Sequence, residues 1–582
     1  MPIFRLSTQP GYKRDGTELD GDFFNDGQHN RFQYGRPKKM GGYKAITDTF
    51  TQPVRALHLW SKQPSNIVHS FATSKVEALL VDNAGSGAAV YDRTPAGFVS
   101  RTDNNWQIDT MFDGAGSAAT RIFAHCAQNG DYIDSSVITP VWYGTTDSTS
   151  ALTSIKLTDV SKAATTGTIT GGTNTLTLSA NTISPPGTAG NTFVKGDLIE
   201  IADAGPGGNT PLYTTITSIS GVNAVLQDNA VSTATAKAVS HIVGTDGGIV
   251  ALGPYLVTYG SYGNVANSDI NQPSLQFTGD YNSANVVGSK IVKGLPIRGG
   301  SNSPAALLWS LDSVIKMSKV SSAEGVFRFD VMSGQSSILS SNSVIEYDGV
   351  YYWVGIDRFL MFSGVVQELP NTLNANWFFD GLNINYRQRV WAMKIPRYGE
   401  IWWFYPRGDA TECTHAIIYN VREKTWYDTE LGRSAGYYSQ VFSFPIMAGT
   451  DSTLWQHEAG FDKVAGDVAT AIPAHFTTSN LGFPTGGPTG ELPQGLNKWS
   501  RLERMEPDFA QVGGMQMTVL TREYANATLV EKGPFEFDRD TTRVDTRVQG
   551  RQLLIKFSSN VLYGDYFMGV PLLHIETGDA RE

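Results

Sequence analysis

Ile401-Trp402-Trp403-Phe404-Tyr405 is the stretch that decides the fold, five large apolar residues in a row that end at Pro406. Successive side chains of a strand point to opposite faces, so this run predicts a strand buried on both faces between neighbouring sheets. Aromatic clusters can also stack on sugars or on single-stranded bases. Because the run is continuous rather than one-sided, we expect core packing here.

Short apolar runs separated by turns lie on both sides of this stretch. Residues 415–420 and 425–427 predict the next two strands, and residues 445–449 and 454–458 predict another hairpin. Similar hairpin groups recur from Val54 onward, each with aromatic residues near a strand end. Repeated antiparallel sheets packed face to face by bulky residues are typical of a β-propeller. The repeat is degenerate and does not give the number of blades.

The composition agrees with an all-β fold. Of 582 residues only 17% are charged, 11% are aromatic, and there are 60 glycines and 26 prolines, which favours strands and turns over long helices. The two cysteines, Cys126 and Cys413, exclude a disulfide framework and a Cys-rich zinc site, and they fit folding in the cytoplasm. The sequence predicts neither a signal peptide nor a membrane-spanning segment.

Composition shifts divide the chain into five predicted parts. From residue 144 to 240 the only aromatic residues are Phe193 and Tyr213, whereas the flanking regions are rich in them. A Gly/Pro/Thr-rich loop from Leu481 to Asn497 marks a second boundary. We therefore predict an extended N-terminal arm (1–50), a propeller-like β-body in two parts (51–143 and 245–477), an inserted small β-domain (144–244) and a C-terminal β-module (478–582).

The motif search favours a protein that is not an enzyme. No phosphate-binding loop or His-Glu-x-x-His pair occurs, and the nine histidines are scattered. Residues 432–436 match Gly-x-Ser-x-Gly, but a strand rather than a helix is predicted to follow, so we expect Ser434 to lie in a turn. The carboxylates considered for glycoside hydrolysis are better explained by turns and strand ends; they are Glu346, Asp348, Asp357 and Glu400. We expect no catalytic residues, cofactor or metal.

One basic segment departs from the formal net charge of −10. Between residues 31 and 44 there is no acidic residue. Such a segment could be a solvated arm or could seat against an acidic partner surface. The candidate assembly residues in it are Arg31, Arg36, Lys38, Lys39 and Lys44.

Four groups of residues carry a resemblance to a known family. They are Gly11-Tyr12-Lys13-Arg14-Asp15-Gly16 with Arg31-Phe32 and Gly41-Gly42-Tyr43; residues 400–406 with 419–420 and 423–426; residues 454–460; and residues 545–552 continuing to 569. Together they resemble the tail hub or nozzle proteins of short-tailed bacteriophages, also called packaged-DNA stabilisation proteins. The inserted domain is not part of this resemblance.

The resemblance implies a virion protein made in the host cytoplasm. It implies a β-propeller-like body that assembles as a homohexameric ring below the portal and its adaptor. Such a ring extends the channel for double-stranded DNA, without sequence-specific binding, and helps retain the packaged DNA until ejection. Two alternatives remain from the residues, namely a receptor-binding tail fibre or spike and a carbohydrate-binding propeller.

Overall fold

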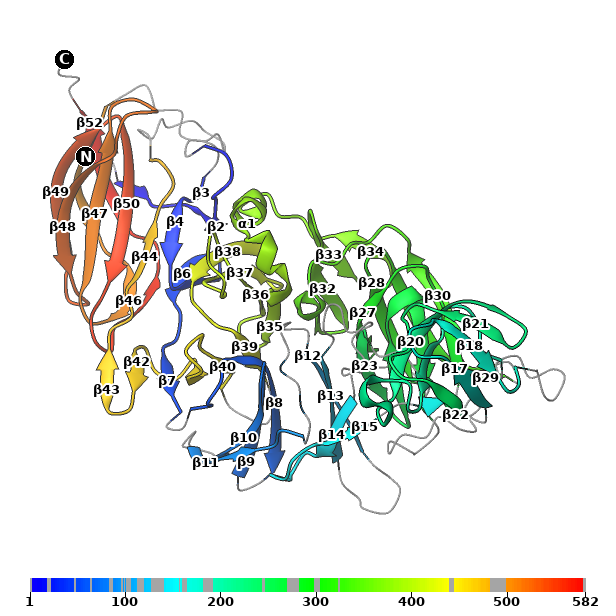
Figure 1. Cartoon of the computed structure of the whole chain (residues 1–582). Coiled ribbons are helices and arrows are strands. Elements are labelled where there is room, and N and C mark those ends of the chain that lie inside the picture. Colours follow the sequence, from blue (N-terminus) through cyan, green and yellow to red (C-terminus); the bar gives the residue numbers. More distant parts are fainter. Residues whose placement is uncertain are drawn as a thin grey trace.

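The chain is all-β, as predicted (Figure 1). The computed structural model describes residues 3–17, 22–46, 49–62, 65–82, 87–95, 98, 100, 106–112, 120–126, 141–155, 158–159, 165–181, 192–242, 246–268, 282–297, 304–322, 325–438, 444–481 and 499–578. Within these ranges the helices are α1 (Ala375–Gly381) and the 3-10 turns η1 (Pro206–Gly208), η2 (Ser261–Gly263), η3 (Ser341–Ser343) and η4 (Ile384–Arg389).

The body consists of consecutive four-stranded antiparallel meanders, which we number as blades in chain order. Blade 1 is β8 (Val54–Lys62), β9 (Ser65–Ala72), β10 (Val76–Asp82) and β11 (Gly87–Asp92); blade 2 is β12 (Trp106–Phe112), β13 (Thr120–Cys126), β14 (Val141–Thr145) and β15 (Thr153–Ile155). Blade 3 is β23 (Gly248–Leu252), β24 (Tyr255–Tyr259), β25 (Asn264–Asn267) and β26 (Asn282–Asn285); blade 4 is β27 (Ile291–Pro296), β28 (Ala305–Ser310), β29 (Val314–Ser322) and β30 (Gly325–Ser333). Blade 5 is β31 (Ile345–Tyr347), β32 (Val350–Val354), β33 (Phe359–Phe362) and β34 (Val366–Glu368); blade 6 is β35 (Trp391–Ile395), β36 (Glu400–Tyr405), β37 (His415–Asn420) and β38 (Thr425–Glu430).

A seventh blade closes the propeller with a strand from the other end of the chain. Its meander is β39 (Ala435–Tyr437), β40 (Ile446–Ala448) and β41 (Leu454–His457), and β7 (Tyr43–Ala45) pairs with β41 as the fourth strand. The hairpin β42 (Lys463–Ala465) and β43 (Val468–Thr470) extends this sheet beyond β7. Contacts link the first strands of successive blades, directly or through η3, and β39 returns to β8, so the ring is closed. The described residues therefore form a seven-bladed propeller.

Adjacent blades share apolar cores, and the decisive stretch contributes to two of them. Trp403 and Tyr405 pack with side chains of blade 5 such as Phe359. Trp402 and Phe404 face the opposite way, into a core that the propeller shares with the C-terminal module. None of these four aromatic residues of β36 is more than 2% exposed, which confirms the prediction of core packing.

The insert forms a closed barrel with a core of its own. Its strands are β16 (Thr158–Asp159), β17 (Thr165–Ile169), β18 (Thr175–Leu178), β19 (Leu198–Ile201), β20 (Leu212–Ser220), β21 (Asn223–Leu226) and β22 (Ala234–Ile242). The pairing of β22 with both β17 and β19 closes the sheet. The barrel starts at β16 rather than at residue 144, because β14 and β15 are still strands of blade 2.

The C-terminal module lies beside the propeller and includes strands from both ends of the chain (Figure 1). One sheet is β1 (Ile3–Arg5), β52 (Leu572–Thr577), β45 (Ser500–Glu506) and β49 (Val544–Gly550), and another is β46 (Phe509–Val512), β51 (Asp565–Met568), β6 (Arg36–Lys39) and β5 (Asn30–Gln33). The largest is β4 (Asp26–Gln28), β44 (Ala474–Thr477), β50 (Gln552–Ser559), β47 (Met515–Arg522) and β48 (Val530–Phe537). A parallel pair, β2 (Gln9–Tyr12) and β3 (Phe23–Phe24), completes the list.

The N-terminal segment differs from the extended arm that the sequence predicted. Its strands β1 and β4–β6 lie in sheets of the C-terminal module, and β7 completes blade 7. The reason is that the N-terminal segment buries large apolar side chains; Tyr12 of β2, Phe24 of β3 and Phe32 of β5 are at most 1% exposed and lie in the shared core. The module also begins before residue 478, at β44, and beyond residue 481 the predicted boundary loop lies outside the described residues.

Candidate assembly site

The N-terminal segment crosses blades 6 and 7 at a buried ion-pair cluster centred on Arg31. The Nε of Arg31 donates to Oε1 of Glu400 at 2.9 Å, and its Nη1 donates to Oε2 of Glu458 at 2.8 Å. Glu400 also accepts from Tyr427 Oη at 2.7 Å and from Trp402 Nε1 at 2.9 Å. The cluster therefore joins β5, blade 6 and the end of β41 through one guanidinium.

This cluster is enclosed, so its charges depend on one another. The side chains of Arg31 and Glu400 are 1% and 0% exposed, and that of Glu458 is 9% exposed. Burial alone would raise the pKa of Glu458, but the Arg31 guanidinium outweighs it and lowers the pKa below its usual value. Arg31 also lies 3.6 Å from the centroid of the Tyr398 ring, which adds a cation–π contact. The hydrogen bonds of Arg31, Glu400 and Glu458 named here are all made to other residues of this chain.

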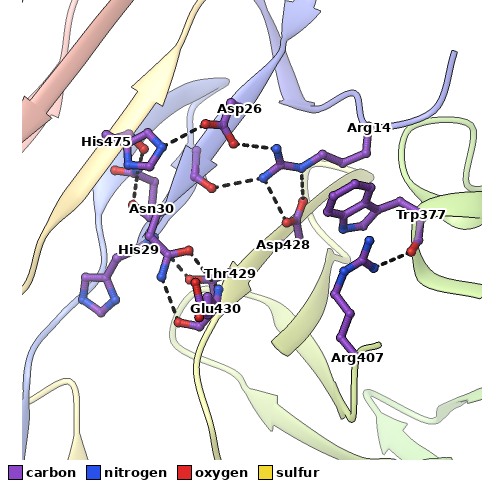
Figure 2. Close-up of polar contacts among 12 residues, drawn as sticks. Arg14, Asp26, His29, Asn30, Trp377, Arg407, Asp428, Thr429, Glu430 and His475 are labelled. Carbon is purple, nitrogen blue, oxygen red and sulfur yellow. Dashed lines mark hydrogen bonds and ion pairs between the residues drawn. The ribbon is translucent and has the colours of Figure 1, made fainter. Parts of the chain in front are cut away.

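A second polar cluster joins the same parts of the chain around Arg14 (Figure 2). Nε and Nη2 of Arg14 each donate to the Asp428 carboxylate at 3.1 Å, in a bidentate pair, and Nη1 donates to Asp26. Asp26 in turn lies 2.9 Å from Nε2 of His475 on β44. Burial would raise the pKa of Asp26, but the hydrogen bond from His475 and the charge of Arg14 lower it well below its usual value. Blade 6 is thus connected to the C-terminal module through β4.

The turn between β5 and β6 is held by a carboxylate of blade 6. Tyr34 and Gly35 both have positive φ angles, 50° and 71°, as a two-residue hairpin turn of this kind requires. Their amides donate to the two oxygens of Glu423 at 2.6 and 3.0 Å. Glu423 lies in the turn between β37 and β38, so a third contact fixes the N-terminal segment on blade 6.

The five candidate assembly residues do not form one exposed basic surface. Arg31 is the centre of the buried cluster, and Lys39, 1% exposed, donates through Nζ to the Gly564 carbonyl at 2.7 Å. Arg36 donates to the Gly569 carbonyl, and Lys38 pairs through its backbone with Phe567. Lys44 on β7 is exposed. Burial lowers the pKa of Lys39, and all five residues make side-chain or backbone contacts within the chain, Lys44 through strand pairing with Gln456 and Val464.

The residues considered for hydrolysis lie in turns and ion pairs, and Glu400 belongs to the Arg31 cluster. Ser434 donates to the Gly449 carbonyl at 3.2 Å and is followed by strand β39, as predicted. Glu346 pairs with Lys394 at 3.0 Å, Asp357 pairs with Arg358, and Asp348 occupies the turn before β32. Among the described residues no group of three or more His, Cys, Asp or Glu side chains is arranged to hold a metal ion. In the same part of the chain, no helix is long and apolar enough to span a membrane.

Sequence reasoning missed the acidic partners of the two arginines. Glu458 and Asp428 were not singled out, because they lie 427 and 414 residues from their partners Arg31 and Arg14 in the sequence. One signal was present. An arginine beside Phe32, in a segment with many apolar aromatic residues, needs a buried acidic partner if that segment packs into a core.

Comparisons with known proteins give no indication of function. No protein-family model matches the sequence, and no curated protein matches it. Among solved structures, BBS1N in complex with ARL6DN shares 7% identity over 72% of this chain and 96% of its own, with a TM-score of 0.34. Saccharomyces cerevisiae Sqt1 shares 9% identity over 72% of this chain and 99% of its own, with a TM-score of 0.30. At these TM-scores neither likeness carries an argument about function.

Proposed function

We propose that the chain is a non-enzymatic structural subunit of the tail of a short-tailed bacteriophage. In this role six copies form a ring below the portal and adaptor, extend the DNA channel and help retain the packaged DNA until ejection. The proposal rests on the resemblance of four groups of residues to tail hub or nozzle proteins, together with where those groups lie in the fold.

The observation that carries the proposal is that the four groups meet at one junction. Arg31, from the first group, binds Glu400 of the second and Glu458 of the third. Lys39, in the same N-terminal segment, donates to the carbonyl of Gly564 in the fourth. These residues join the propeller to the C-terminal module. A subunit in the wall of a ring needs such a junction, because its two contact surfaces must keep a constant angle for the ring to close.

The charge of the chain is compatible with a DNA channel. Six copies with a net charge of −10 carry a formal −60, and a wall of the same sign as DNA favours sliding over binding. Basic side chains of the N-terminal segment such as Arg31 and Lys39 bind partners within the chain, so they do not offset this charge at an exposed surface. This balance is compatible with channel passage without sequence-specific binding.

Native mass spectrometry of the pure chain, alone and mixed with the portal–adaptor complex of the same phage, tests the proposal. We expect six copies to add to the complex. Arg31→Met should lower the number of copies added, because it breaks the junction, while Arg328→Ala, at an exposed pair, should leave it at six. Absence of binding by the folded wild-type chain, or a free trimer, would contradict the hub role and favour a fibre or spike.

A further inference from the structure

A pocket of about 320 Å³ opens beside α1, separate from the Arg31 cluster. The N-terminal segment supplies Arg14, Asp15 and Gly16, and the end of β36 is followed by Arg407 on the opposite wall. The remaining wall belongs to α1 and is lined by Asn376, Trp377, Asp380 and Gly381. Figure 2 shows the Trp377 ring between the two arginines.

Arg407 is fixed in this pocket with one edge of its guanidinium unused. Its Cζ lies 3.6 Å from the centroid of the Trp377 ring, and Nη1 donates to the Trp377 carbonyl at 2.6 Å. Nε and Nη2 have no hydrogen-bond acceptor among the residues that the structure describes. These two N–H groups form a planar fork that matches the two oxygens of a carboxylate.

The other charges around the pocket determine which anion fits. The charge of Arg14 is already offset by Asp26 and Asp428. The Asp15 carboxylate accepts from the amides of Asn376 and Trp377, both at 2.8 Å, and Asp380 is exposed on the wall. One open cation beside two carboxylates disfavours a doubly charged phosphate more than a singly charged carboxylate, which the fork of Arg407 can bind directly.

We propose that this pocket is a subsite for one carboxylate group, held by Nε and Nη2 of Arg407 above the Trp377 ring. The carboxylate can come from a free small acid or from an Asp or Glu side chain of a second copy of this chain, since the recognising chemistry is the same. The subsite does not depend on the proposed tail role, because it uses residues outside the Arg31 junction.

Saturation-transfer NMR on the full chain tests the subsite, with benzoate as the ligand and benzamide as its neutral analogue. We expect transfer to benzoate but not to benzamide, competition by acetate, and weaker competition by inorganic phosphate at pH 7.5. Arg407→Gln should abolish the benzoate signal. Equal signals for benzoate and benzamide, stronger competition by phosphate, or a benzoate signal that survives Arg407→Gln would overturn the proposal.

Two further variants keep the test independent of any folding defect at Arg407. Asp380→Asn removes a repelling charge from an exposed position and should tighten benzoate binding by about three- to tenfold. Gly381→Ala places a Cβ 2.0 Å from Nη1 of Arg407, so the guanidinium must move and binding should weaken. Arg328→Gln, at an exposed ion pair elsewhere, is the matched control and should change nothing. Unchanged affinity in both Asp380→Asn and Gly381→Ala would count against the subsite.

Sedimentation of the chain with and without acetate separates the two sources of the carboxylate. Self-association that acetate and Arg407→Gln both weaken identifies a side chain of a second copy as the occupant. No self-association, or self-association that neither changes, with benzoate binding intact, favours a free small acid.

Discussion

Arg31 and Glu400 are 369 residues apart in the sequence, yet the Nε of Arg31 donates to Oε1 of Glu400 at 2.9 Å inside the protein. The pair lies where β5 crosses blade 6, and Glu458 of blade 7 completes it. A buried ion pair of this kind gains little net stability over an apolar replacement of all its members. Loss of one member is costly, however, because the remaining charges stay buried without a partner.

Arg31→Met should therefore destabilise the chain strongly. We expect a loss of about 3–5 kcal/mol, the cost of leaving a buried partner charge uncompensated. Urea unfolding followed by near-UV circular dichroism measures it. Arg328→Ala is the control; that arginine is 68% exposed, so its pair with Asp330 should contribute at most about 1 kcal/mol. Equal stabilities for the two variants would show that the cluster does not hold the junction.

Gly42→Ala should weaken the closure of blade 7. A Cβ at Gly42 would lie 2.3 Å from the Asp462 carbonyl oxygen and 2.4 Å from its amide nitrogen, and backbone atoms cannot rotate away. We expect a loss of about 1–3 kcal/mol from the strain of overpacking. Gly514→Ala, whose Cβ would meet nothing within 4 Å, should be close to neutral. Limited proteolysis at increasing temperature compares them, and earlier cleavage of Gly514→Ala would contradict this account.

The sequence predicted the strands better than it predicted how they assemble. Apolar runs located β8, β9 and the decisive strand β36, because each run buries its side chains against adjacent sheets. The blade number could not be found by local reasoning, since blade 7 takes its fourth strand, β7, from residues 43–45. Pairing between strands so distant leaves no periodic signal in the sequence.

The same limit explains why the sequence did not predict that Arg31 of the candidate site is buried. Residues 31–44 were recognised as basic, but the alternatives of a solvated arm and a partner-binding arm both assumed that the charges were exposed. The aromatic side chains of the N-terminal segment show that this part of the chain is buried. Tyr12 and Phe32 pack edge to face on each other and each on Tyr427. That packing carries Arg31 into the core with them, where only the fold supplies its acidic partners.

Deletion of residues 1–46 should prevent folding rather than release an independent arm. The deletion removes the fourth strand of blade 7. It also removes β1, β4 and the hairpin β5–β6, which pair with strands in three sheets of the C-terminal module. We expect insoluble or protease-sensitive protein, as size-exclusion chromatography and proteolysis would show. A soluble monomer with the unfolding temperature of the full chain would indicate that the segment is dispensable.

The stability of the chain should fall as the pH drops from about 6.5 to about 4, in part because of His58. Burial lowers the pKa of His58 from 6.5 to about 4, so in this window the unfolded chain binds a proton that the folded chain does not. That difference costs up to about 3 kcal/mol at the acidic end. His58→Phe should flatten the dependence, and no hydrogen bond of Nδ1 is lost, since that atom has no partner among the described residues. An identical slope of unfolding temperature against pH in the variant would exclude His58 as a source.

Excision of residues 158–242 should leave the rest of the chain folded. The two ends of this segment are neighbours, because Thr158 pairs with Ile242 between β16 and β22, so a short Gly-Ser linker can replace it without moving blades 2 and 3. The barrel's buried core runs from Ile169 to Val239 and includes no side chain of the propeller. We therefore expect an unchanged unfolding temperature for the excised protein, and a cooperative transition for residues 158–242 expressed alone, both measured by differential scanning calorimetry. A lower unfolding temperature after excision would mean that the barrel stabilises the propeller through surface contacts.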